Sequence, residues 1–102
     1  MTLVPAEHVD DTESVLFRDA ALNKPGQFSY YQTSRASHAG MNYVCPCGCG
    51  ALGSLPFRNE TPERPSWVWD GNVEIPTLTP SVQRTVGCKW HGFLTDGVWR
   101  TV

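Results

Sequence analysis

Four cysteines and one histidine lie in two short clusters, and thiolate and imidazole are the side-chain groups that zinc prefers in proteins. The first cluster, CPCGCG, places Cys45, Cys47 and Cys49 at every second position, each followed by proline or glycine. The second, CKWH, places Cys88 three residues before His91, a spacing at which both side chains can reach one ion across a tight turn. We therefore expect one zinc ion that joins two distant parts of the chain and stabilises a small domain.

The five candidate ligands exceed the four that a structural zinc site takes. Either Cys45, Cys47, Cys49 and Cys88 complete the site and His91 is free, or His91 is a ligand and one cysteine of the first cluster is spare. The alternatives to a metal are two disulfides, or four buried thiols that pack as small apolar groups. Disulfides are disfavoured because a bridge within Cys-x-Cys would be strained.

Ser81, in the segment PTLTPS, is the residue that suggests catalysis. A serine becomes a nucleophile when a base lies within hydrogen-bond reach, and His91 is the natural candidate for that base. A zinc-activated water with Glu74 as general base is a third chemistry, but thiolate-rich sites are more often closed and structural. We expect the other two histidines, His8 and His38, at the surface.

The pattern of apolar residues predicts a mostly β fold in one small domain over residues 1–102, cross-linked by one zinc, with its motif-bearing core at 43–100. Strands are indicated at QFSYY, MNYV, ALGSLPF and SWVWD, and HGFLT-DG-VWRTV is typical of a β-hairpin with a two-residue turn. At most one short helix is expected, over residues 11–22, where SVLFR is equally compatible with a strand, and 58–65 reads as an exposed loop. The four tryptophans are expected to fill the core.

Composition limits the partners and the compartment. The net charge of −2 and pI near 5.8 make nucleic-acid binding unlikely. No run of roughly 18–20 apolar residues predicts a membrane span, and the first residues lack the pattern of a secretion signal. We therefore expect a cytoplasmic protein, a compartment in which cysteine clusters more often bind metal than form disulfides.

Three motifs, CPCGCG, PSWVWDGNVEIPTLTPSV and CKWHGFLTDGVW, resemble a small uncharacterised family of bacteriophage and bacterial proteins, often labelled ammonia monooxygenases. That chemistry requires copper and a membrane assembly, so we set the label aside. The family is similar to a bacterial group found with ubiquitin-like conjugation genes, whose members are suspected proteases. The cysteines, Pro80-Ser81 and His91 match that group, but Tyr43 stands where the group carries histidine, and KWHG (89–92) replaces a serine–histidine–tyrosine run.

Two functions are compatible with these residues. The first, which the sequence favours, is a zinc-binding accessory domain of phage or mobile-element origin whose structural metal supports binding to a protein partner. The alternative is a hydrolase, a peptidase of the kind that processes ubiquitin-like proteins, with Ser81 as nucleophile and His91 as base.

Overall fold

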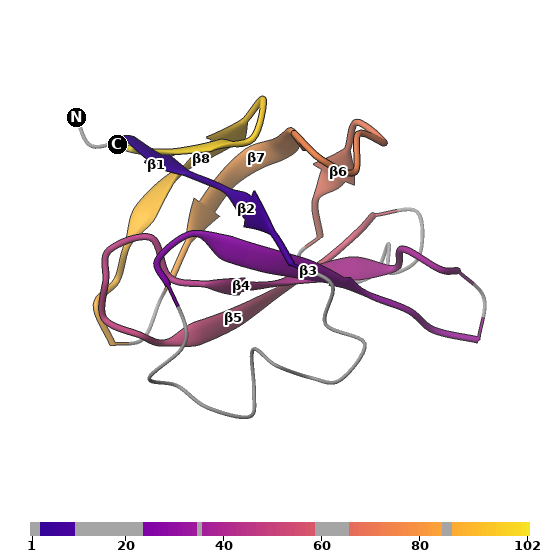
Figure 1. Cartoon of the computed structure of the whole chain (residues 1–102), viewed down its shortest axis with the longest axis horizontal. Coiled ribbons are helices and arrows are strands. Elements are labelled where there is room, and N and C mark those ends of the chain that lie inside the picture. The colour runs from indigo at the N-terminus through magenta and orange to yellow at the C-terminus, as the bar shows by residue number, and fades with distance from the viewer. Residues whose placement is uncertain (1–2, 10–23, 35, 59–65, 85–86) are drawn as a thin grey trace.

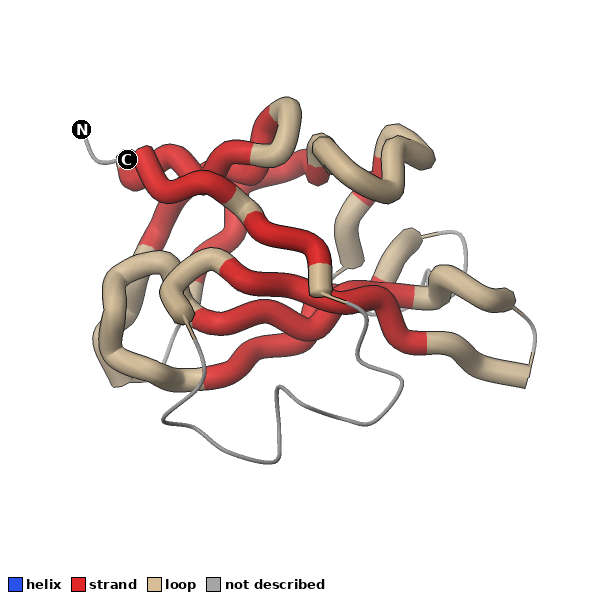
Figure 2. The backbone as a smooth tube through the Cα atoms, in the orientation of Figure 1, coloured by secondary structure: helices blue, strands red, loops and turns tan. Residues whose placement is uncertain are grey.

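The computed structural model describes residues 3–9, 24–34, 36–58, 66–84 and 87–102, which form nine β-strands and no helix (Figures 1 and 2). The mostly β prediction is confirmed, whereas the helix predicted over 11–22 lies outside the described residues. Within the described residues, no helix has the length and apolar character to cross a membrane. The strands are β1 (Leu3–Pro5), β2 (Glu7–His8), β3 (Gln27–Tyr31), β4 (Gly40–Val44), β5 (Leu52–Pro56), β6 (Val68–Trp69), β7 (Leu78–Gln83), β8 (His91–Thr95) and β9 (Val98–Thr101).

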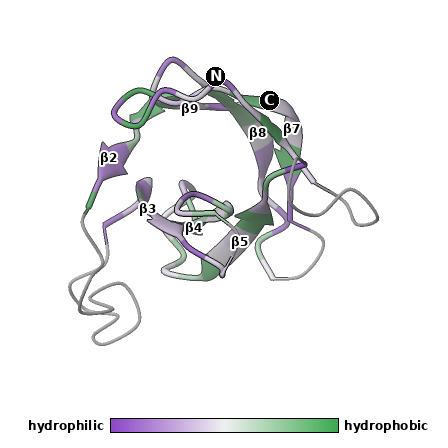
Figure 3. Cartoon of the chain, turned by 90° about the vertical axis from the view of Figure 1, so that its right-hand side faces the viewer, coloured by the Kyte–Doolittle hydropathy of each residue, from purple (hydrophilic) through white to green (hydrophobic). Residues whose placement is uncertain are grey.

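The strands form two sheets that face each other, as the end view in Figure 3 shows. One sheet has the order β1-β9-β8-β7-β6, and the other has the order β2-β3-β4-β5. Strands β1 and β2 are separated by Ala6, so the chain crosses from one sheet to the other almost without interruption. On the far side, Phe57 and Trp67 form a parallel bridge between the end of β5 and the start of β6. The two sheets are thus joined along both sides.

The C-terminal hairpin β8–β9 has the turn that its sequence predicts. Asp96 and Gly97 both have positive φ, 48° and 74°, and Thr95 pairs with Val98 across the turn. Two consecutive residues with positive φ are the signature of the tight turn that matches the twist of the flanking strands. The hairpin prediction is therefore confirmed in detail.

Tryptophan side chains occupy the space between the sheets, as expected. Trp99 is fully buried and Trp90 nearly so, while Trp67 and Trp69 are partly buried and pack against the same cluster. Trp99 lies 5.1 Å from the ring of Tyr43 and donates its indole N–H to the backbone oxygen of Gly26. A small β domain gains most of its apolar burial from such large side chains.

A second aromatic cluster surrounds Tyr30. His8, His38 and Trp69 lie within about 5.5 Å of the Tyr30 ring, with centroid distances of 5.3, 4.8 and 5.2 Å. His8 and His38, which were expected at the surface, are both partly exposed, and each lies against the Tyr30 ring. The Tyr30 hydroxyl donates to the Val73 backbone oxygen at 2.9 Å, which ties the loop before β7 to the other sheet, and burial raises the pKa of this hydroxyl.

Strand β7 is one of the strands that the sequence did not predict, and its pairing with β8 is irregular. Leu78 pairs with Leu94 and Val82 with Gly92, so three residues of β7 lie opposite the single residue Phe93. Such a bulge changes the direction of the side chains within it, and bulges are common beside functional sites. Ser81 is one of the three residues in this bulge.

Gly92 offers a test of the packing beside His91. A Cβ at this position would lie 2.5 Å from the Trp90 ring and would also collide with the backbone of Arg100. We expect Gly92→Ala to lower the free energy of unfolding by about 1–3 kcal/mol, measured by urea denaturation with zinc present. Phe93→Ala, which truncates an exposed side chain on the same strand, is the matched control. Equal stability of Gly92→Ala and the unaltered chain would contradict this packing.

Candidate functional site: a four-thiol cluster and a serine–histidine pair

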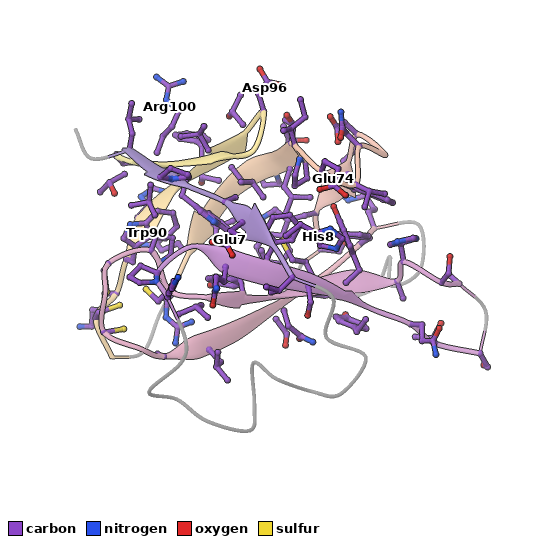
Figure 4. The ribbon with its side chains drawn as sticks, in the orientation of Figure 1. Glu7, His8, Glu74, Trp90, Asp96 and Arg100 are labelled. Atoms are coloured by element: carbon purple, nitrogen blue, oxygen red, sulfur yellow. The ribbon has the colours of Figure 1, made fainter. Side chains whose placement is uncertain are left out.

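The four cysteines converge at one end of the two sheets. Cys45 follows directly after β4 and is buried, Cys47 and Cys49 lie in the exposed turn behind it, and Cys88 precedes β8. Their sulfur atoms all lie within 4.8 Å of one another, and none is in a disulfide. Figure 4 shows sulfur atoms gathered on the Trp90 side of the molecule. The two cysteine motifs predicted to meet are therefore together.

The spacing of the sulfur atoms fits a tetrahedral metal ion. Cys45 Sγ lies 3.3 Å from Cys47 Sγ and 3.4 Å from Cys88 Sγ, and Cys49 Sγ lies 3.7 Å from Cys88 Sγ. Four thiolates at a zinc–sulfur distance of about 2.3 Å would stand about 3.8 Å apart, close to this arrangement. The Cys49 backbone N–H also donates to Cys47 Sγ at 3.3 Å. Hydrogen bonds of this kind orient and stabilise metal-binding thiolates.

The thiols differ in how readily each loses its proton. Burial raises the pKa of Cys45 well above its usual range and also raises the pKa of Cys47. A hydrogen bond from the Trp90 backbone N–H, together with the neighbouring thiols, lowers the pKa of Cys88 to about 6. Cys88 is thus the thiol of the cluster that most readily takes the thiolate form, which is the form that binds a metal.

His91 is not part of the thiol cluster. Its Nε2 lies 3.0 Å from Ser81 Oγ, within hydrogen-bond distance. His91 and Ser81 come from the neighbouring strands β8 and β7, and both side chains are half-buried. Among the described residues, the group able to hold a metal contains Cys45, Cys47, Cys49 and Cys88 alone. The geometry matches the arrangement in which four cysteines are together and the histidine is free.

The backbone on either side of this pair is held in place. The Trp67 indole N–H donates to the Ser81 backbone oxygen at 3.2 Å, so the bulge of β7 is fixed from the side opposite β8. The Val102 N–H donates to the His91 backbone oxygen at 3.0 Å, which extends the pairing of β8 with β9. The backbone of Ser81 is therefore held by Trp67 on the side away from β8, and the backbone of His91 is held by Val102 on the side away from β7.

A serine hydroxyl in contact with imidazole nitrogen can act as a nucleophile. If Ser81 donates to Nε2, the proton of the neutral ring is on Nδ1, and Nε2 is free to accept the hydroxyl proton during attack. Within the described residues, Ser81 is the side chain that hydrogen-bonds this ring. The arrangement is therefore that of a serine–histidine pair.

Two other residues singled out from the sequence lie elsewhere. Glu74 contacts His8 Nδ1 at 3.4 Å and does not belong to the thiol group. Figure 4 labels both residues, away from the sulfur atoms near Trp90. Tyr43, which replaces the histidine of the similar group, is buried, and its hydroxyl accepts a hydrogen bond from Arg84 at 3.4 Å. Burial raises the pKa of Tyr43. Tyr43 is thus part of the core between the sheets.

Comparison with known proteins identifies the family. The family model described as bacterial ubiquitination-like system serine protease (BubE) matches residues 15–102. The chain therefore belongs to this family, as its resemblance to proteases associated with ubiquitin-like conjugation predicts. No curated protein and no solved structure is similar enough to count as a match.

Metal content distinguishes the two ligand sets. We expect one zinc ion per chain by native mass spectrometry, and the same content in His91→Ala, because the imidazole lies at Ser81 and not among the thiols. Cys88→Ser should lose the ion, since it removes the sulfur that approaches both Cys45 and Cys49. Loss of zinc from His91→Ala would show that histidine is a ligand and would contradict the four-cysteine site.

Proposed function

We propose that this protein is a serine peptidase with Ser81 as nucleophile and His91 as general base. The observation that carries the proposal is the 3.0 Å contact between Ser81 Oγ and His91 Nε2 on adjacent strands. Membership of a serine protease family supports the same chemistry. The accessory-domain hypothesis accounts equally well for the thiols but gives this contact no role.

The residues divide the reaction in the usual way for serine catalysis. Ser81 Oγ attacks the carbonyl carbon of the substrate peptide bond as its proton passes to His91 Nε2. His91 then gives this proton to the leaving nitrogen as the C–N bond breaks, which leaves an acyl ester on Ser81. A water molecule, deprotonated by His91, attacks the ester and releases the carboxylate and the free hydroxyl.

We assign the four cysteines to a structural zinc ion. Four thiolates fill a tetrahedral coordination shell, so no position remains for a water that could act as a nucleophile. The ion, when bound, supplies a cross-link between the turn after β4 and the segment before β8. The cysteines would thereby hold β8, which carries His91, against the other sheet.

We infer that the substrate is a protein, namely a ubiquitin-like protein or a conjugate of one, because the family is described as the serine protease of a bacterial ubiquitination-like system. The outer face of the five-stranded sheet offers a surface for it, since His91 and Phe93 project from the same side of β8. Phe93 lies opposite Arg100, and Arg100 lies opposite Leu3, with Phe93 46% and Leu3 60% exposed. The expected protein partner is thus proposed to be the substrate, met in the cytoplasm of a bacterial or phage-infected cell.

A fluorophosphonate probe tests the nucleophile directly. We expect labelling at Ser81, identified by peptide mass spectrometry, none in Ser81→Ala, and a rate roughly a hundredfold or more lower in His91→Ala. Ser37→Ala is the matched control, because Ser37 Oγ also lies 3.2 Å from a histidine ring, that of His38, at an exposed position. Absence of labelling at Ser81 in folded protein would refute the peptidase.

Removal of the metal tests the structural role of the thiol cluster. With a chelator, we expect the melting temperature and the rate of Ser81 labelling to fall together, because the cross-link positions β8 without taking part in the reaction. Both quantities would be followed on the same samples, by tryptophan fluorescence and by probe incorporation. Loss of labelling while the melting temperature stays unchanged would instead indicate metal-dependent chemistry.

A further inference from the structure

A pocket of about 300 Å³ lies between β5 and the end of β7, where Val82, the residue after the proposed nucleophile, forms part of its wall. Its walls come from β5 and from the end of β7, including Leu52, Ser54, Val82 and Gln83. Trp67 also lines it, and the indole of this residue is hydrogen-bonded to the Ser81 backbone oxygen. The part of the wall that comes from β7 therefore starts at Val82, the residue after the one that we propose as nucleophile.

Among the described residues, no backbone hydrogen bond is made to the middle of the β5 edge that faces this pocket. Pairs 45/51 and 39/57 are joined by backbone hydrogen bonds between β4 and β5, and such pairs alternate with pairs whose backbone groups point away. Ser54, opposite Asn42, belongs to the second kind. Its N–H and C=O therefore point away from β4, toward the pocket that Ser54 lines.

The edge of β7 presents the same arrangement. The Arg84 N–H donates to the Trp90 backbone oxygen at 2.8 Å, so by alternation the backbone groups of Gln83, opposite His91, point away from β8. Strand β6, the neighbour of β7 on that side, pairs only with Leu78 and Thr79. Gln83 thus also directs an N–H and a C=O toward the pocket.

Side chains limit the length of the open stretch. At one end, the Arg84 guanidinium donates to the Leu52 backbone oxygen and to the Tyr43 hydroxyl, both at 3.4 Å. At the other end, Trp67 donates its backbone N–H to the Pro56 oxygen. The distance along β5 from Leu52 to Pro56 is about 13 Å at the rise of a strand, enough for three or four extended residues.

We propose that this pocket binds an extended segment of the substrate polypeptide, which adds to the edge of β7 by pairing with the backbone of Gln83. Strand addition of this kind uses the main chain for affinity, and it would place the substrate backbone beside Ser81. Ser54 supplies a second unpaired edge on the opposite wall. The inference rests on the proposed function, since it describes how the same serine receives its substrate.

Two phosphonate probes separate pairing from reactivity. A simple alkyl fluorophosphonate needs only Ser81 and His91, whereas acetyl-Ala-Ala-Ala diphenyl phosphonate also offers a backbone with minimal side chains. We expect N-methylation of an internal amide of the tripeptide probe to lower its labelling rate about tenfold, the typical effect of one lost hydrogen bond. Equal rates for the methylated and unmethylated probes would overturn the inference.

Variants of the protein give the reciprocal measurement. Gln83→Pro removes the edge N–H, while Gln83→Ala removes the same side chain and retains that N–H, so their difference isolates the backbone donor. We expect the ratio of tripeptide to alkyl labelling to be about tenfold lower in Gln83→Pro than in Gln83→Ala. An equal ratio in the two variants would contradict pairing at Gln83. If Gln83→Pro does not fold, the methylated probes on the unaltered chain decide the matter.

The failure of the peptidase itself would look different. If the alkyl probe does not label Ser81, the proposed function fails, and binding is then measured on ¹⁵N-labelled Ser81→Ala with acetyl-Ala-Ala-Ala-amide at millimolar concentration. Chemical-shift changes confined to the amides of Gln83, Ser54 and their neighbours would support peptide binding in the pocket even though the catalysis had failed. Unchanged chemical shifts at these amides would overturn the proposal that the pocket binds an extended peptide.

Discussion

The convergence of four thiols is the constraint on which the rest of the molecule depends. The turn after β4 belongs to the four-stranded sheet and Cys88 to the connection that leads into the five-stranded sheet, so a metal held by Cys45 and Cys88 would join the two layers at one end. The aromatic cluster around Tyr30 lies toward the other end of β4, since Tyr30 pairs with Met41. Between the thiol cluster and the Tyr30 cluster, tryptophan rings fill the space between the sheets.

Between Cys88 and His91, residues suited to stabilising the fold stand next to the residue proposed to act as base. Cys88 belongs to the thiol cluster, Trp90 turns inward, and His91 turns outward to Ser81. Gly92 leaves room for the inward Trp90 ring, which lies where a larger residue at position 92 would place its side chain. A residue of the thiol cluster, a core residue and a candidate base therefore follow one another within four positions without sharing a role.

The sequence predicts most of the strands and the meeting of the cysteines, whereas the contact between Ser81 and His91 depends on long-range strand pairing. Alternating apolar residues and the Asp96-Gly97 turn predicted the strands and the hairpin because both signals are local. The five candidate ligands could not be reduced to four, since only the register of β7 on β8 places His91 beside Ser81. The direction of Ser81 depends on a bulge, and the sequence PTLTPS contains no pattern that would predict a strand with three residues opposite one. The strands β1 and β2 were missed for a similar reason, because two or three residues are too few to show alternation.

The first two strands, β1 and β2, belong to the two sheets but lie outside the residues that the family model matches. The family model starts at residue 15, yet β1 and β2 lie before it. Val4 sits opposite Trp99, and Glu7 pairs beside Gln27, so this segment covers the edges of both β9 and β3. A chain trimmed to the matched residues would present two bare strand edges to solvent, and bare edges invite pairing between molecules. The segment before the family match thus extends both sheets by one strand and pairs with β9 and β3, two strands that lie within the match.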